Sequence, residues 1–191
     1  MRIIAGRFKG RRLAPPDWTG LRPTSDKLRE TLFNVLAPRI EGARVVDGCA
    51  GTGALGLEAL SRGAAHVAFV ESDRRAVDLI RRNAAACGVE ADYTIDTGDV
   101  VAWLKRAGSA RFDLILLDPP YGSPLIGKAL AAGAECLVPG GVLVLERATR
   151  SEPDVPATLV RLRDIKSGDS TLTLFARTAD ARPAPEAPGE P

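Results

Sequence analysis

The sequence predicts an α/β fold with a doubly wound, mostly parallel seven-stranded sheet that has helices on both faces. Three observations support this fold class. Short apolar runs alternate with helical patterns from residue 43 onward, and parallel strands need such crossover helices. Gly63 and Gly88 follow two of these patterns, where helix C-terminal glycines belong. The last two apolar runs have no helix between them, which predicts an antiparallel C-terminal hairpin at the sheet edge.

The first 36 residues are expected to add a small N-terminal β-hairpin and a helix to the sheet. Residues 2–6 and 10–14 are two short strand-like runs around a turn, and a pair of prolines then breaks the pattern. Residues 25–36 carry apolar side chains at offsets of three and four, which is one face of a helix. Thr24 or Ser25 is available as its N-cap.

The remaining elements follow in βα order. The expected strands are residues 44–47, 66–71, 92–96, 112–118, 141–146, 159–165 and 170–177. The expected helices between them are residues 54–62, 74–87, 100–107 and 125–137. The chain then divides into a basic extension (1–22), an α/β domain (23–177) and a Pro-, Ala- and Glu-rich tail (178–191) that is expected to be disordered.

Composition limits the classes of protein to which the chain can belong. It has 191 residues, of which 45% are apolar, enough to bury the core of one α/β domain. No apolar run reaches the length of a membrane span, and no signal peptide is evident, so we expect a cytoplasmic, monomeric protein without a membrane partner. The three cysteines form no CxxC pair and there is one histidine, so neither a disulfide framework nor a metal site is expected.

The charge of the chain is unevenly distributed. The net charge is only +2, yet the first 22 residues hold six basic side chains against one acid, Asp17. A basic segment attached to a nearly neutral body indicates a polyanionic partner, and a solvated basic surface is the alternative. The candidate residues for binding such a polyanion are Arg2, Arg7, Lys9, Arg11, Arg12 and Arg22.

A glycine-rich loop joins the first parallel strand to the next helix. Glycines there let the backbone approach a ligand, and the helix N-terminus offers unpaired N–H groups. Residues 51–56 match the GxGxxG fingerprint, and Glu71 at the end of the next strand can bind a ribose diol. Such a loop serves NAD or S-adenosylmethionine. The candidate cofactor-binding residues are Asp47, Ala50, Gly51, Thr52, Gly53, Glu71, Ser72 and Asp99.

The acid that ends the first strand favours S-adenosylmethionine over NAD. Asp47 precedes Gly51 by several residues, whereas a dinucleotide loop has its first glycine almost directly after the strand. A buried carboxylate would repel a pyrophosphate, but it suits a cofactor with a cationic amino acid end. Asp99 is a candidate acceptor for the adenine amino group, and the N-cap of the following helix is an equally good role for it.

The strand 112–118 ends in Asp118-Pro119-Pro120-Tyr121, at the edge where a doubly wound sheet binds its ligands. Two prolines remove two N–H donors and leave carbonyl acceptors. An exocyclic amine on a base is a poor nucleophile until acceptors hold its N–H groups. Asp118 and the carbonyl of Pro119 are that pair of acceptors, and Tyr121 would stack on the base. Taken without its place in the chain, the motif could also be a proline turn that follows a buried strand and has no catalytic role.

The chain resembles the bacterial 16S ribosomal RNA guanine-N2 methyltransferases that act on the small subunit. The resemblance covers residues 2–177 and rests on four segments: residues 2–6, residues 21–34, residues 50–59 and residues 118–121. It implies a Rossmann-like methyltransferase fold for residues 23–177, S-adenosylmethionine as cofactor, and 16S rRNA or a small-subunit assembly intermediate as partner. It also implies that residues 22–24, including Thr24, fold over the cofactor and that the basic hairpin grips RNA. The family usually has a large aromatic residue in place of Cys49.

Three other interpretations remain open at this point. The same chemistry could act on adenine N6 in DNA or RNA, because the Asp118 motif does not name the base. The GxGxxG match allows a nucleotide-binding oxidoreductase. A non-catalytic RNA-binding assembly factor would explain the basic segment but not the strand-end acids Asp47, Glu71 and Asp118.

Overall fold

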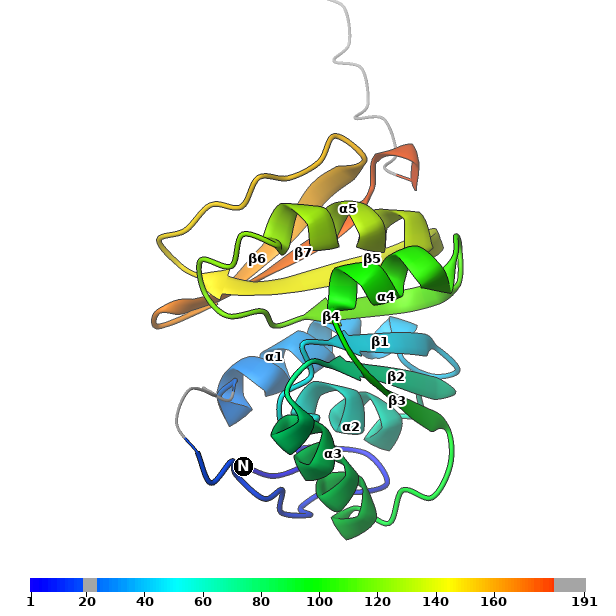
Figure 1. The fold of residues 1–191 in the computed structure, drawn as a ribbon, viewed down its shortest axis with the longest axis vertical. Coiled ribbons are helices and arrows are strands. Elements are labelled where there is room, and N and C mark those ends of the chain that lie inside the picture. Colours follow the sequence, from blue (N-terminus) through cyan, green and yellow to red (C-terminus); the bar gives the residue numbers. More distant parts are fainter. Residues whose placement is uncertain (19–23, 181–191) are drawn as a thin grey trace, which may run out of the picture.

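The computed structural model describes residues 1–18 and 24–180, and one seven-stranded sheet runs through the middle of them (Figure 1). The strand order is β3-β2-β1-β4-β5-β7-β6. Strands β1 to β5 are parallel, while β7 is antiparallel to both β5 and β6. Their bounds are β1 Arg44–Gly48, β2 His66–Glu71, β3 Tyr93–Thr97, β4 Phe112–Leu117, β5 Leu137–Ala148, β6 Leu159–Ser167 and β7 Ser170–Arg177. The predicted sheet, including its C-terminal antiparallel hairpin, is confirmed.

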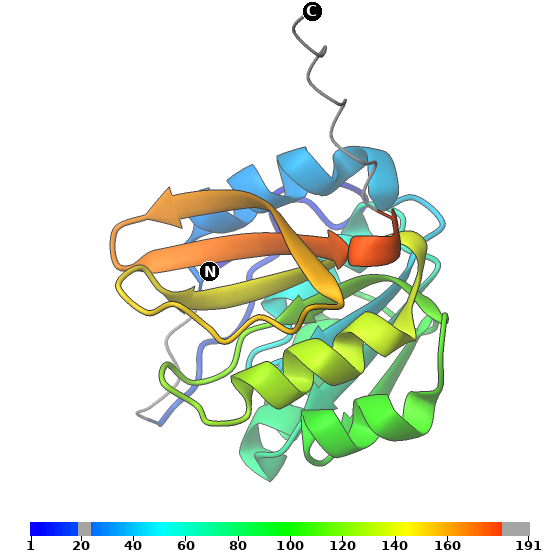
Figure 2. The ribbon, with the colours of Figure 1, turned by 90° about the horizontal axis from the view of Figure 1, so that it is seen from above.

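The helices cover both faces of this sheet. Helices α1 to α3 pack their apolar side chains on one face, and α4 and α5 pack theirs on the other. Figure 2 shows α1 and α5 on opposite sides of the strands. The bounds are α1 Asp26–Leu36, α2 Ala54–Ser61, α3 Arg74–Ala86, α4 Val100–Ala107 and α5 Ile126–Cys136. In the part of the chain that the structure describes, no helix is long and apolar enough to cross a membrane.

The two cores follow from the alternation of side chains along each strand. In β1, Val45 packs with the α1–α3 side and Val46 with the α4–α5 side. In β4, Leu116 packs with the α1–α3 side and Leu117 with the α4–α5 side. All four side chains are almost completely buried, as expected for a sheet covered by helices on both faces.

The predicted N-terminal β-hairpin is not seen. Its two runs meet in a single isolated bridge between Arg2 and Arg12. Around this bridge, backbone N–H groups donate from Ile3 to Arg11, from Gly10 to Ile3 and from Leu13 to Met1, at 2.9, 2.9 and 3.2 Å. Beyond it the backbone bonds to α2: the N–H groups of Ile4 and Ala5 donate to the buried Glu58 carboxylate at 2.8 and 3.1 Å. The N–H of Arg7 also donates to a carbonyl of α2, at 2.8 Å. Because these donors are used across the chain, a ladder between the two runs cannot continue.

The predicted ends of the elements differ from the observed ends by a few residues. Ser25 is the N-cap of α1, and its Oγ accepts the N–H of Leu28 at 3.2 Å. Strand β5 begins before its predicted start because Leu137 is already in register with Phe112 of β4. Residues 178–180, placed in the predicted tail, form a short 3₁₀ helix. The rest of that tail lies outside the described residues.

Candidate active site

Four acidic side chains share one face of the sheet at the carboxyl ends of neighbouring strands. Asp47 on β1 is in register with one residue on β2 and one on β4, and the latter is in register with one residue on β5. Glu71, Asp118 and Glu146 each follow one of these three positions by two residues. Because side chains alternate with a period of two, all four acids belong to the face covered by α1–α3. The strand order reverses between β1 and β4, which is where a doubly wound sheet binds its ligand.

The glycine-rich loop is held in place by two of these acids. The N–H of Gly56, in α2, donates to Asp47 Oδ2 at 2.8 Å. The N–H of Gly51 donates to Glu71 Oε2 at 2.8 Å. Gly53 is the N-cap residue of α2 with φ of 76°, a left-handed conformation that glycine adopts without strain. The acids therefore fix the loop between β1 and α2 against the end of β2.

The Glu71 carboxylate keeps capacity for a ligand after these bonds are made. Its Oε1 accepts the N–H groups of Ser72 and Asp73 at 2.7 and 2.9 Å. A carboxylate has about four lone-pair sites. These two bonds, with a longer one from the Ser72 hydroxyl at 3.4 Å, occupy Oε1, and the bond from Gly51 takes one site on Oε2. The remaining site, on Oε2, can accept one hydroxyl donor, as a ribose diol would supply.

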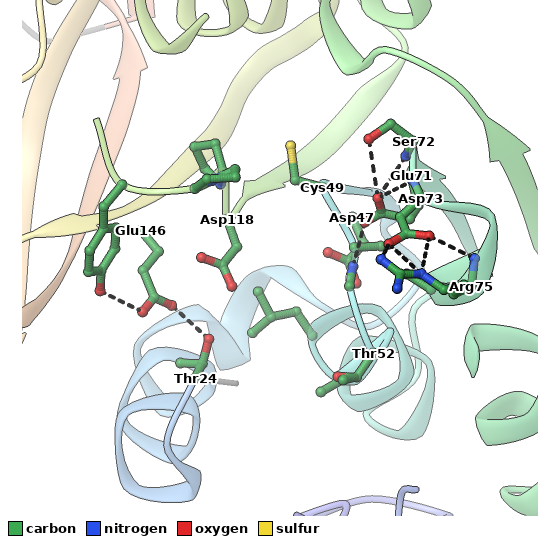
Figure 3. A pocket seen from close by; sticks show the side chains of 18 of the residues that line it. Thr24, Asp47, Cys49, Thr52, Glu71, Ser72, Asp73, Arg75, Asp118 and Glu146 are labelled. Carbon is green, nitrogen blue, oxygen red and sulfur yellow. Dashed lines mark hydrogen bonds and ion pairs between the residues drawn. The ribbon is translucent and has the colours of Figure 1, made fainter. Parts of the chain in front are cut away.

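A cavity of about 540 Å³ opens above this edge of the sheet. Its size is within the usual range for small-molecule and cofactor sites. Figure 3 shows Asp47 and Glu71 at one end, with Asp118, Glu146 and Thr24 at the other. The residues that line it are Trp18, Thr24, Asp47, Cys49, Ala50, Gly51, Thr52, Ala54, Leu55, Glu71, Ser72, Asp73, Arg75, Ala76, Asp118, Pro119, Pro120, Tyr121 and Glu146.

The Asp118 motif forms one end of the cavity. Pro119 is buried, and the carbonyl of Pro120 accepts the N–H of Ser123 at 3.1 Å, which closes a turn. The Tyr121 ring is 41% exposed, while its hydroxyl lies 2.7 Å from Ser170 Oγ on β7. The hydroxyl is thus anchored on the neighbouring hairpin, and the ring lies in the wall of the cavity.

Burial raises the pKa of two aspartates of the cavity, Asp47 and Asp118. It raises the pKa of Asp47 to about 8, against a backbone hydrogen bond from Gly56 that lowers it. Burial, with Glu146 and Asp47 nearby, also raises the pKa of Asp118 well above its ordinary value. Bringing a cation into the cavity would stabilise the ionised carboxylates and reverse these shifts.

Cys49 has no role in the chemistry that we can assign. It lies in the cavity wall with φ of 60°, an uncommon conformation for a residue other than glycine. Burial and the nearby carboxylates of Glu71 and Asp118 raise the pKa of its thiol to about 12. The thiol is therefore uncharged at neutral pH and a poor nucleophile.

The structure brings most of the predicted site residues together. Those that line the cavity are Thr24, Asp47, Ala50, Gly51, Thr52, Glu71, Ser72, Asp118, Pro119, Pro120 and Tyr121. Gly53 and Asp99 are not among the lining residues. Asp99 is exposed and caps α4, since its Oδ1 accepts the N–H of Ala102 at 2.8 Å.

Sequence reasoning missed several residues of the cavity wall. The most important is Glu146, which is 5% exposed and accepts the Thr24 hydroxyl at 2.7 Å. A signal was present, because Glu146 ends the predicted strand 141–146 as the other acids end theirs. Trp18 and Arg75 had no such signal; the Arg75 guanidinium lies 5.0 Å from the Trp18 ring centroid, across segments distant in sequence.

The basic residues of the N-terminal segment lie on the surface. Each of the five that the structure describes is exposed, namely Arg2, Arg7, Lys9, Arg11 and Arg12. Arg22, together with Pro23, lies outside the described residues. The guanidinium groups of Arg7 and Arg11 lie 4.7 and 5.9 Å from the ring centroid of Phe8, which holds them on one patch.

The cavity fits S-adenosylmethionine better than a dinucleotide. Asp47 is 1% exposed, and its Oδ1 has no hydrogen-bond partner among the described residues. A buried carboxylate oxygen without a partner is unfavourable, and a cationic ammonium group would satisfy it. Asp118 and Glu146 extend the negative lining, which would repel a pyrophosphate. The fold and the site together define the class: an S-adenosylmethionine-dependent methyltransferase with a Rossmann-like fold.

The chain belongs to the family described as "Conserved hypothetical protein 95", whose model matches residues 1–176. It is 35% identical over 182 residues to the "Ribosomal RNA small subunit methyltransferase D" of Escherichia coli K12, covering 94% of this chain and 91% of that protein. It is 33% identical to the "Putative rRNA methyltransferase YlbH" of Bacillus subtilis 168, covering 93% of this chain and 99% of that one.

The chain is also similar to solved structures over most of its length. The putative methyltransferase YhhF from Escherichia coli superimposes with a TM-score of 0.81 at 34% identity, covering 93% of this chain and 97% of that chain. A hypothetical protein of Thermus thermophilus superimposes with a TM-score of 0.78 at 31% identity, covering 92% of this chain and 99% of that chain. These likenesses agree with the methyltransferase class and leave the oxidoreductase interpretation without support.

Proposed function

We propose that the protein transfers a methyl group from S-adenosylmethionine to the exocyclic N2 amino group of one guanine in 16S ribosomal RNA. The observation that carries the proposal is the position of Asp118 beside the cofactor-type loop, in one cavity that Tyr121 also lines. The relatives named as small-subunit rRNA methyltransferases support the RNA substrate. The resemblance of residues 21–34 to the guanine-N2 enzymes supports the base and the atom.

Each group at the base end of the cavity has a defined task in this reaction. When bound, the cofactor supplies a methyl group already activated on a sulfonium, so no protein nucleophile is required. Asp118 and the Pro119 carbonyl accept the two N–H groups of the amine, which frees the nitrogen lone pair from the ring. Tyr121 stacks on the base and aligns the nitrogen. After the N–C bond forms, the proton that the nitrogen loses passes to the Asp118 carboxylate.

We assign residues 1–22 as the RNA-contacting extension and residues 23–177 as the catalytic domain. The five exposed basic side chains of the described part of the extension can pair with phosphates. The extension is not a separate body, since Glu58 of α2 binds its backbone. We further propose that the enzyme is a monomer that acts on rRNA in the cytoplasm.

Asp118→Ala tests the proposed reaction. We expect it to lower methyl transfer to small-subunit particles by at least ~100-fold, because an acceptor for the reacting amine is lost. Binding of S-adenosylhomocysteine, measured by calorimetry, should change far less. Asp78→Ala, which removes an exposed carboxylate of α3, is the matched control. Wild-type turnover by the Asp118 variant would contradict the acceptor role.

The base and the atom are tested by digesting the methylated rRNA to nucleosides. We expect N2-methylguanosine at one position, which is absent from cells that lack this protein. N6-methyladenosine would instead support the adenine alternative, and no methylated nucleoside at all would favour a non-catalytic assembly factor.

A further inference from the structure

Glu146 is a buried acid of the cavity for which the proposed reaction has no use so far. It lies in β5, is 5% exposed, and stands beside Asp118 on the neighbouring strand (Figure 3). Leu117 and Leu145 are in register, so the two acids that follow them lie level with each other on the same face. The cofactor end of the cavity, marked by Asp47 and Glu71, is on the other side of Asp118.

The partners of Glu146 fix the direction of its carboxylate. Oε2 accepts the Thr24 hydroxyl at 2.7 Å, and Oε1 lies 3.5 Å from the Tyr121 hydroxyl. Each carboxylate oxygen has two lone-pair sites, so each keeps one site for a further donor. Held by side chains from two other segments, Glu146 keeps one acceptor site on each oxygen in the wall of the cavity, beside Tyr121.

We propose that Glu146 recognises the substrate base by accepting the N1–H and one N2–H of guanine on its two carboxylate oxygens. The proposal rests on the guanine-N2 function proposed above and names the residue that selects the base. Guanine is the base with two such adjacent donors on its Watson–Crick edge, and a carboxylate matches them as a bidentate pair. In this arrangement Glu146 takes the N2–H that was assigned above to the Pro119 carbonyl, and Asp118 accepts the other N2–H, so the amine is held from both sides.

The same geometry rejects the other bases. Adenine and cytosine place a ring-nitrogen lone pair next to their amine, and that lone pair would face a carboxylate oxygen. Uracil has a ring N–H but no adjacent amine to methylate. Thr24, which donates its one hydroxyl proton to Glu146 and lies beside Asp118, positions Glu146 and is not itself an acceptor for the base.

Glu146→Gln gives a readout that a merely structural role would not produce. The amide can donate to adenine N1 and accept an adenine N6–H, so the preferred substrate base should change from guanine to adenine. We expect kcat/KM on particles with the native guanine to fall by about 10- to 100-fold. On particles reconstituted with adenine at the target position, the variant should form N6-methyladenosine where the wild type forms none. Glu135→Gln, at an exposed site of α5, is the control and should match the wild type on both substrates.

A second arm uses the wild-type enzyme, so it does not depend on how well the variant folds. RNA with 1-methylguanine at the target lacks the N1–H, and we expect a loss of at least ~10-fold. RNA with 7-deazaguanine keeps both donors and should be methylated normally. Undiminished guanine methylation by Glu146→Gln, or normal use of the 1-methylguanine RNA, would overturn the assignment. If the wild type formed no N2-methylguanosine on any particle, the proposed function itself would fail.

Discussion

Asp47→Asn should make the protein more stable at alkaline pH while it abolishes cofactor binding. Asp47 is 1% exposed, and burial raises its pKa to about 8 in the folded protein, from an ordinary value of 3.8. Between these two values the folded state binds a proton that the unfolded state has released. The contribution of Asp47 to the free energy of unfolding is therefore fully present below pH ~4 and is lost as pH rises from about 4 to 8. An asparagine at this position has no such proton to lose.

The magnitude follows from the two pKa values. A group that titrates near 4 when unfolded and near 8 when folded lowers the free energy of unfolding by on the order of 5 kcal/mol at alkaline pH. For a chain of this size each kcal/mol moves Tm by about 2–4 °C. We therefore expect the variant to unfold only a few °C above the wild type at pH 5, and on the order of 10–20 °C above it at pH 9.

Thermal unfolding followed by circular dichroism at both pH values is the assay. The control is Asp78→Asn, which removes an exposed carboxylate and should leave the pH dependence of Tm unchanged. Calorimetry tests the predicted role of Asp47 in cofactor binding. The affinity of the wild type for S-adenosylmethionine should rise with pH until about 8, because Asp47 must ionise to bind a cation. If Tm of the variant and the wild type fell in parallel between pH 5 and 9, the reasoning about Asp47 would be refuted.

Two further predictions concern α2. Gly56→Ala would be mildly stabilising in an exposed helix, but here the added Cβ meets the Phe69 ring, so we expect a loss of about 1–3 kcal/mol in urea unfolding. A stabilised variant would contradict the close packing of α2 on β2. Glu58→Ala leaves two backbone N–H groups of the N-terminal segment without their acceptor, so trypsin should cleave that segment much faster and stability should drop by about 3 kcal/mol. Cleavage at the rate of the exposed-site control Glu41→Ala would argue against this anchor.

Much of the fold and half of the site could be predicted because their signals are local. The spacing of apolar residues along the chain predicts strands and helices, and glycines such as Gly63 and Gly88 mark where helices end. Asp47, Glu71 and Asp118 were recognisable since an acid at the end of a buried parallel strand lies at the ligand edge whatever the details of packing. Glu146 obeys the same rule and was within reach of the sequence.

Only the tertiary structure decided how distant segments pair. The expected N-terminal hairpin gave way to bonds with Glu58, more than 50 residues away, because a buried carboxylate competes for the same N–H donors. The contact of Thr24 with Glu146 spans 122 residues and depends on the register of β4 and β5. The sequence by itself determined the elements, the cofactor loop and the strand-end acids. Which acids face one another, and which oxygens remain free for a base, depends on packing between elements that no local pattern encodes.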